Sequence, residues 1–238
     1  MELEFYGNEG WISPTDHHSC FSIKEEGTKI LVDAGSPTIV HEGNMDIDAI
    51  LLTHIHLDHI KNLYNLIGYM NVRNREEELP VYSPDNLNEH ITKKVKPEIP
   101  ADSGINYEFI EEPPERIGNL NIDHLKSRQL TPPPVDVYLY KIKNQDTTLT
   151  QVIDVELNEE IKKFCEGTDV LICDASQPNQ PPIEGVHMTP NQVNELVNHV
   201  EPEKVILTHF DVVHPQEFKE KVNHDDITCA EEGLKIEI

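Results

Sequence analysis

Three histidines and an aspartate occur within six residues in the first third of the chain. They are His54, His56, Asp58 and His59, and they follow an apolar run at 49–52. On an extended segment His54 and His56 point the same way, whereas Asp58 and His59 fall on the first turn of a following helix. Imidazole is the commonest protein ligand of zinc and related divalent ions. The alternative is a solvated helix start with an aspartate cap, but histidines have no structural reason to cluster there, so the sequence favours a metal site.

The surrounding pattern predicts short strands that deliver these residues to one edge of a sheet. Apolar runs of strand length alternate with turns, and after residue 53 the apolar spacing changes to that of a helix over 57–70. A proline-punctuated middle follows. Strands are expected at 3–6, 20–23, 29–32, 49–53, 81–82, 107–110, 120–122, 135–142, 149–153, 170–173 and 205–208, and further helices at 86–95, 158–165 and 190–200. No composition break divides the chain, so residues 1–238 are predicted to form a single domain of two sheets packed face to face beneath outer helices.

Composition restricts the classes of function. The chain has 238 residues, of which 37% are hydrophobic, and a net charge of −25. This charge repels polyanions, so nucleic acid is a disfavoured partner. No apolar run approaches the roughly 18 to 20 residues of a membrane span. The start of the chain lacks signal-peptide features and the four cysteines lack framework spacing, which predicts a cytoplasmic protein with free thiols and no membrane partner.

The histidine-rich segment resembles the signature H-x-H-x-D-H of the metallo-β-lactamase superfamily, which His54, His56, Asp58 and His59 meet in full. The sequence LVDAG at 31–35 is similar to the family's second strand, with Asp33 at the rim of the site. The sequence THF at 208–210 is similar to the strand end that carries the last ligand, His209, and 230–234 is similar to the final hairpin. The resemblance implies a four-layer αββα sandwich of two mixed β-sheets and two divalent ions, zinc first and manganese or iron as alternatives.

The bridging carboxylate has two candidates, Asp154 and Asp174, because each follows an apolar strand. The order of elements in the family assigns Asp154 to the metals and Asp174 to the substrate rim or to the shell around the ligands. The alternative for either residue is a turn or helix cap. The family's third-motif histidine is absent. Gln129 is the best positional match and a weak ligand, and His124 is a second possibility, so the first metal site is expected to be weak or empty.

One branch of the superfamily fits best. The segment GWISPT at 10–15, followed by Ser19, resembles the start of ribonuclease Z and related phosphodiesterases, and DAS at 174–176 with GVHMT at 185–189 is similar to the part of that branch in which a histidine acts on the leaving group. This gives His187 a catalytic role, with a helix-capping histidine as the alternative. The neighbouring His17 and His18, and also His214, either contact substrate or are simply exposed.

These residues predict a metal-dependent hydrolase, with a phosphodiesterase acting on a small or modified phosphodiester as the leading interpretation. Asp58 would orient the attacking water, and His187 would protonate the leaving oxygen. The same scaffold also allows lactone, ester or thioester hydrolysis. A third hypothesis is a metal-binding protein with impaired catalysis, because the third-motif histidine is missing. Processing of tRNA 3′ ends is opposed by the net charge, and a homodimer is a further expectation of the branch.

Overall fold

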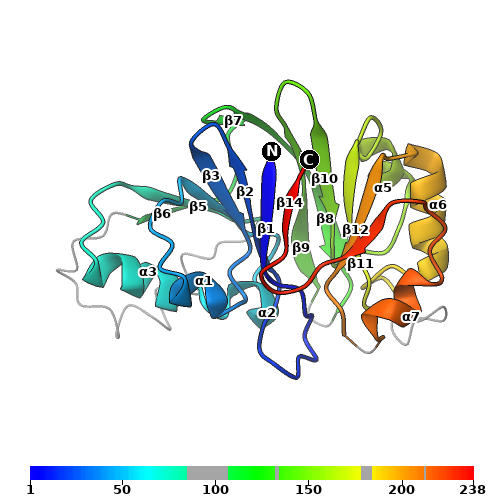
Figure 1. The fold of residues 1–238 in the computed structure, drawn as a ribbon, viewed down its shortest axis with the longest axis horizontal. Helices are drawn as coiled ribbons and strands as arrows, with labels where there is room; N and C mark the ends of the chain where they lie inside the picture. The colour runs from blue at the N-terminus through cyan, green and yellow to red at the C-terminus, as the bar shows by residue number, and fades with distance from the viewer. Residues whose placement is uncertain (85–106, 132–133, 178–183, 212) are drawn as a thin grey trace.

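A computed structural model describes residues 1–84, 107–131, 134–177, 184–211 and 213–238, and shows two β-sheets between two sets of helices (Figure 1). The first sheet runs in the order β14 (Lys235–Glu237), β1 (Glu2–Gly7), β2 (Cys20–Glu25), β3 (Thr28–Val32), β4 (Ala49–Leu51), β5 (Leu79–Tyr82) and β6 (Tyr107–Ile110). The second runs in the order β13 (Ile227–Cys229), β12 (Lys204–Thr208), β11 (Val170–Asp174), β10 (Thr148–Val152), β9 (Val135–Lys143), β8 (Leu120–Gln129) and β7 (Arg116–Ile117).

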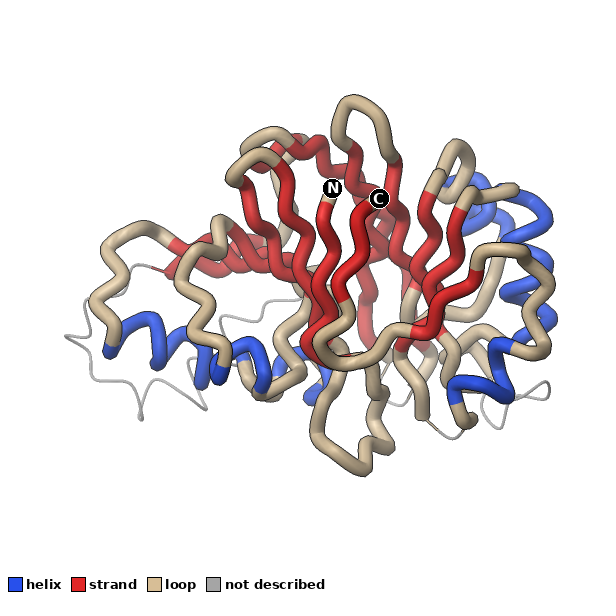
Figure 2. Tube along the Cα trace, viewed as in Figure 1, coloured by secondary structure: helices blue, strands red, loops and turns tan. Residues whose placement is uncertain are grey.

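Both sheets are mixed. In the first, β1, β2 and β3 pair antiparallel and β3 to β6 pair parallel. In the second, β10 to β13 pair parallel and β7 to β10 pair antiparallel. The helices lie on the outside (Figure 2). They are α1 (Thr38–His41), α2 (Leu57–Ile60) and α3 (Leu63–Val72) beside the first sheet, and α5 (Glu159–Phe164), α6 (Pro190–Val200) and α7 (Pro215–Lys219) beside the second. The predicted αββα architecture is confirmed.

Three apolar layers hold this sandwich together. Strand β3 is buried along its whole length, and its alternate residues serve different layers: Ile30 and Val32 face the core between the sheets, whereas Leu31 faces the helices. Strand β11 repeats the arrangement, with Ile172 in the central core and Leu171 under the outer helices. The continuous apolar runs in the sequence therefore reflect burial on both faces, as in other parallel sheets covered by helices.

The helix predicted over 57–70 is interrupted. Helix α2 ends at Ile60 and α3 begins at Leu63, because the turn after β3 binds the intervening residue. The backbone N–H of Asn62 donates to Ala34 O at 2.9 Å, and its side chain donates to Gly35 O at 2.7 Å. A Cβ on Gly35 would lie 1.9 Å from the carbonyl oxygen of Asp58, so this close approach requires glycine. The break fixes the direction in which Asp58 and His59 project.

The hairpin predicted at 230–234 is wrong. Strand β13 pairs parallel with β12 in the second sheet, whereas β14 pairs antiparallel with β1 in the first, so the chain crosses between the sheets. The crossing brings the termini side by side (Figure 1), where the Met1 ammonium donates to Ile238 O at 2.7 Å. The helix predicted at 86–95 lies outside the described residues. Within the described ranges, no helix has the length and apolar character to cross a membrane.

Candidate metal centre

The candidate site lies where strands from both sheets end. Asp33 follows β3 and His54 lies just past β4, while Asp154 and His209 follow β10 and β12 and Asp174 closes β11. The carboxyl ends of parallel strands form the usual binding crevice of such sheets. Asp33, Asp154 and His209 have φ of 59°, 59° and 60°, in the left-handed region that residues other than glycine seldom adopt. Such turns let the backbone leave the strand while the side chain stays at the sheet edge.

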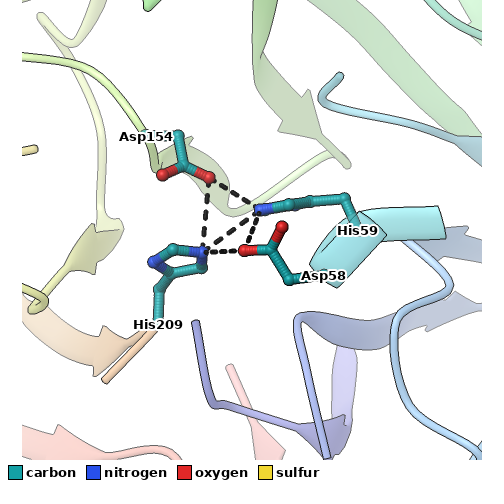
Figure 3. A group of neighbouring side chains, drawn as sticks. All are labelled: Asp58, His59, Asp154 and His209. Carbon is teal, nitrogen blue, oxygen red and sulfur yellow. Dashed lines mark hydrogen bonds and ion pairs between the residues drawn. The ribbon is translucent and has the colours of Figure 1, made fainter. Parts of the chain in front are cut away.

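Four side chains converge at the centre of this edge: Asp58, His59, Asp154 and His209 (Figure 3). The Nε2 atom of His59 lies 2.6 Å from Asp154 Oδ2 and 3.4 Å from Asp58 Oδ2. The Nε2 atom of His209 lies 3.3 Å from each of the same two oxygens, and the two Nε2 atoms are 3.1 Å apart. All four residues are buried. Two carboxylates and two imidazoles that present their ligand atoms to one point form a donor set suited to a divalent cation.

The two oxygens of Asp154 face different groups. Oδ2 points to the histidine cluster, and Oδ1 lies 3.0 Å from both Gln129 Nε2 and His187 Nδ1. Because a carboxylate oxygen only accepts, the amide nitrogen of Gln129 is the group that faces it. The amide oxygen of Gln129 accepts from Thr131 Oγ1 at 3.0 Å. Gln129 therefore restrains the central carboxylate, and its role as a substitute ligand stays a prediction.

His54 and His56 lie beside this cluster. Their rings pack edge to face with centroids 4.5 Å apart, and the His54 and His59 rings are 4.1 Å apart. His54 Nε2 is fully buried without a hydrogen-bond partner, and it lies 3.6 Å from Asp154 Oδ2. A buried ring nitrogen left without a partner is costly unless something binds it. A cation beside Asp154 Oδ2 would satisfy it, so these residues also fit a metal.

A buried layer behind the cluster fixes the orientation of His59. Its Nδ1 atom lies 2.7 Å from Asp33 Oδ2 and 3.0 Å from Thr53 Oγ1. Asp33 in turn accepts from Ser19 Oγ at 3.0 Å and from the Thr53 backbone N–H at 2.8 Å. A carboxylate that receives the second ring nitrogen of a histidine is the usual partner of a metal-binding imidazole, because it fixes the tautomer and the ring plane.

His209 and His187 each have a similar partner at Nδ1. His209 Nδ1 lies 2.8 Å from Ser176 Oγ, and His187 Nδ1 lies 2.7 Å from Asp174 Oδ2. Asp174 also accepts from the backbone N–H groups of Asp154 and Ser176, at 3.0 and 2.8 Å. The Asp174 carboxylate thus orients both the ring of His187 and the turn that carries Asp154.

The electrostatics of the site favour a bound cation. Burial would raise the pKa of Asp58 and of Asp154, but the neighbouring histidines, His59 and His209, hold both pKa values well below the ordinary one. Burial lowers the pKa of His54 well below its usual value, which keeps this imidazole neutral and able to bind metal. The ion-pair partners that the structure gives Asp58 and Asp154 are all histidines. The carboxylates therefore have no permanently charged partner in these pairs.

His187 has the opposite electrostatic setting from His54. Its burial lowers its pKa, but the adjacent carboxylates of Asp174 and Asp154 outweigh that effect and raise the pKa to about 11. The imidazole is thus positively charged at neutral pH. Its Nδ1 atom is engaged by the carboxylates, which leaves Nε2 as the N–H available to a substrate.

A cavity of about 460 Å³ opens onto these groups. Its walls come from both sheets and from the loop between β1 and β2, which projects at the bottom of Figure 1. It is lined by Trp11, Ile12, His56, Asp58, Gln129, Thr131, Asp154, Ser176, Gln177, Val186, His187, His209 and Asp211. A volume of this size suits a small molecule.

Some histidines predicted from the sequence lie elsewhere. His18 is a buried residue of the loop between β1 and β2, with Nδ1 2.8 Å from Gly10 O, and His17 pairs with Glu232. The His124 ring on β8 packs at a tilt against the Tyr138 ring on β9, and His214 caps α7. None of these four is among the described residues that line the cavity. The sequence did not predict a role for Thr53 or Ser176. Thr53 directly precedes His54, and Ser176 ends the DAS motif at 174–176.

Comparison with known proteins identifies the family and the fold. Residues 28–210 match the family model described as a β-lactamase superfamily domain. A ribonuclease Z from Nitrosopumilus maritimus is 22% identical over all of both chains. Among solved structures, the metallo-β-lactamase fold protein YhfI from Bacillus subtilis has a TM-score of 0.83 at 19% identity, covering 99% of this chain and 98% of that one.

Two further structures carry the same fold. The short form of human tRNase Z has a TM-score of 0.80 at 17% identity, covering 100% of this chain and 99% of that one. A diphosphatase from the PhnP family has a TM-score of 0.78 at 18% identity, covering 100% and 97%. At these identities the structural similarities demonstrate the fold alone.

Proposed function

Because this chain belongs to the β-lactamase superfamily and is a metal-dependent hydrolase, we propose that it hydrolyses a small phosphodiester. The observation that carries the proposal is the cluster of Asp58, His59, Asp154 and His209 at the floor of a small-molecule cavity, with a charged His187 beside it. The cluster, where a water nucleophile would be activated, and the proton donor His187 thus face the same cavity. The names of the relatives, which include a ribonuclease Z and a tRNase Z, point to the same bond type.

The four clustered residues would hold one divalent ion, and His54 and His56 would hold a weaker one that shares Asp154. Gln129, whose amide lies 3.0 Å from Asp154 Oδ1, stands where the family's third-motif histidine is expected, and an imidazole there would bind a metal more strongly. Zinc is the first candidate, with manganese and iron as alternatives. Such ions supply two things when bound: they lower the pKa of water toward neutrality, and they offset the charge that develops on phosphate oxygens.

The chain's own groups would perform the remaining steps. Asp58 is ionised and reaches the cavity, so its carboxylate accepts a hydrogen bond from the attacking water and orients it. The attacking water releases one proton to solvent as its oxygen bonds to phosphorus. As the ester P–O bond breaks, His187 donates its Nε2 proton to the leaving oxygen and is then reprotonated from solvent. Asp174 and Asp154 stabilise the protonated ring before that transfer. Proton donation of this kind typically contributes about 10² to 10⁴ in rate.

A small substrate is favoured over a large nucleic acid. The net charge of −25 opposes the approach of a polyanion. For tRNA, this repulsion would have to be overcome by a local basic surface. We therefore propose a small or modified phosphodiester as substrate.

The direct test assays the purified protein on bis(4-nitrophenyl) phosphate, an aliphatic lactone and a thioester, with added zinc or manganese and with a chelator. Bound metal is measured in parallel by inductively coupled plasma mass spectrometry. We expect metal-dependent hydrolysis of the diester, abolished by the chelator and by Asp154→Asn. His124→Ala is the matched control, because it removes a histidine outside the cavity.

The other outcomes each contradict the proposal in a different way. Faster hydrolysis of the lactone or thioester than of the diester would indicate carboxylic-acid-derivative chemistry. Stoichiometric metal without hydrolysis of any substrate would indicate a metal-binding protein with impaired catalysis.

A further inference from the structure

Of the large apolar side chains that are exposed among the described residues, all but Val72 line the cavity or are flanked in the chain by residues that line it. Among the described residues, five of this kind are exposed: Trp11 (63%), Ile12 (57%), Leu57 (52%), Leu130 (56%) and Val72 (78%). Trp11 and Ile12 line the cavity directly. Leu57 lies between His56 and Asp58 in the chain, and Leu130 between Gln129 and Thr131, so both are flanked by cavity residues. Exposed apolar patches of this kind commonly mark binding sites.

The segment that carries Trp11 is fixed to the metal-binding edge. The Gly10 N–H donates to Phe210 O at 3.0 Å, and the Phe210 N–H donates to Asn8 O at 2.9 Å. The Ile12 N–H donates to Asp211 Oδ1 at 2.6 Å. Of these partners, Phe210 and Asp211 directly follow His209 in the chain. A Cβ on Gly10 would lie 2.9 Å from His209 Cε1 and 2.8 Å from Asp211 Oδ1, so the loop packs closely against this edge.

These hydrogen bonds fix the backbone that carries Trp11 and Ile12, which form an apolar wall of the cavity, relative to His209. An indole on a fixed backbone loses the freedom of only two side-chain torsions when a ligand binds its flat face. Val186 also lines the cavity and adds to its apolar part. The wall is therefore suited to one planar group of the substrate.

The charges of the cavity limit what else the substrate carries. Its described lining residues include Asp58, Asp154 and Asp211 but neither lysine nor arginine. A phosphodiester has a single negative charge, which the cluster's cation would neutralise. A phosphomonoester or polyphosphate would bring further negative charge beside these aspartates, where the described lining offers no lysine or arginine to pair with it.

We infer that the substrate is a singly charged phosphodiester in which one ester group is a planar aromatic ring that stacks on Trp11 and contacts Ile12. This inference rests on the proposed function and names its substrate class. An aryl alcohol and a nucleoside both supply such a ring, and a phenyl and a thymidyl diester distinguish the two sources.

The test compares three diesters with the same 4-nitrophenyl leaving group, whose second ester group is methyl, phenyl or 5′-thymidyl. We expect the wild-type protein to prefer the phenyl or thymidyl diester over the methyl one, and the preferred ring identifies the source. Trp11→Ala should lower kcat/KM for the preferred aromatic diester about tenfold or more, mainly through KM, a loss typical of a stacked ring. The methyl diester should change less than about twofold, since the ester group that stays on its phosphorus carries no ring to stack.

Two variants serve as controls. Trp11→Phe retains a ring and should keep most of the aromatic preference. Val72→Ala removes another exposed apolar side chain, which lines a separate depression beside α1 and α3, and it should leave all three rates unchanged. Equal losses on the methyl and aromatic diesters in Trp11→Ala would overturn the inference, because they would indicate a structural role of the loop.

A binding measurement separates this inference from the proposed function. Trp11 is the chain's single tryptophan, so its fluorescence reports directly on the wall. Diphenyl phosphate should quench it saturably, and dimethyl phosphate should not. Failure to hydrolyse any of the three diesters would refute the proposed function, whereas absence of quenching would refute the stacking. A change of molecular mass in Trp11→Ala, measured by analytical ultracentrifugation, would also overturn the inference, because the wall would then be a subunit contact.

Discussion

Replacement of Asp33 tests whether the buried layer behind the cluster controls metal binding. Asp33 is fully buried and touches no cavity space, yet its Oδ2 atom lies 2.7 Å from His59 Nδ1. Asp33→Asn keeps the size and one acceptor but removes the charge that fixes the His59 tautomer. Carboxylates in this position typically contribute about 10- to 100-fold to metal affinity, which equals about 1.4 to 2.7 kcal/mol.

The truncation Asp33→Ala should have a larger effect on folding. It leaves the Thr53 N–H, the hydroxyls of Thr53 and Ser19, and the ring N–H of His59 without their acceptor. Loss of one partner in a buried charged network costs about 3 to 5 kcal/mol of unfolding free energy. We expect Asp33→Ala to lose about that much, and Asp33→Asn less.

Two measurements check these expectations. Competition with a chromophoric chelator gives the zinc Kd of each variant, and urea unfolding of the metal-free proteins gives the stability. Asp136→Asn is the matched control, since Asp136 is a partly exposed aspartate on β9 that pairs with Lys126. If Asp33→Asn bound zinc as tightly as the wild type, the role assigned to Asp33 would be wrong.

Three further outcomes follow from the geometry. His187→Ala should lower turnover of diesters with poor alkyl leaving groups by about 10² or more and that of 4-nitrophenyl diesters far less; equal losses would argue against proton donation. In metal-free protein, the lowered pKa of Asp154 contributes stability that is present above its ordinary value of 3.8 and is lost as the pH falls below it. Between pH 5 and 2, the unfolding free energy measured in urea should therefore fall less steeply with pH in Asp154→Asn than in the wild type, by up to about 1.4 kcal/mol per pH unit. Identical slopes would contradict a lowered pKa of Asp154. Gln129→His should raise the number of tightly bound zinc ions, and an unchanged count by mass spectrometry would place the weak position elsewhere.

Much of the fold was predictable because its strands are short and continuously apolar. The expected strand at 107–110 and the helix at 190–200 match β6 and α6 residue for residue. Helix α6 carries its start signal locally, with Thr189 in a capping box and Pro190 at the first turn. The resemblance to the metallo-β-lactamase superfamily and its ribonuclease Z branch is confirmed by the comparisons.

The errors arose where distant contacts override local pattern. Apolar spacing alone favours one helix through Asn62, and only the pairing of that residue with the turn after β3 breaks it. The crossing from β13 to β14 depends on which sheet has a free edge, which no local signal encodes. Elements of three to five residues, such as α1 and α7, are too short for periodicity to reveal them.

Of the site residues, too, some could be predicted from the sequence and others could not. The segment around His54 was identifiable because its ligands are adjacent in sequence, and the grouping of distant Asp154 and His209 came from the order of elements in the family. The hydroxyl partners Thr53 and Ser176 were missed, since such residues are common and only their distances to ring nitrogens single them out. The left-handed backbone at three strand ends was equally invisible, because aspartate and histidine adopt it only where the fold requires it.

The most direct test of the account is a crystal structure of the zinc-loaded protein with anomalous maps above and below the zinc edge. We expect an ion about 2.0 to 2.2 Å from Asp58, His59, Asp154 and His209. A second, lower peak beside His54 and His56 would mark the weaker site. A fully occupied zinc bound elsewhere, with these four side chains unliganded, would contradict the central claim.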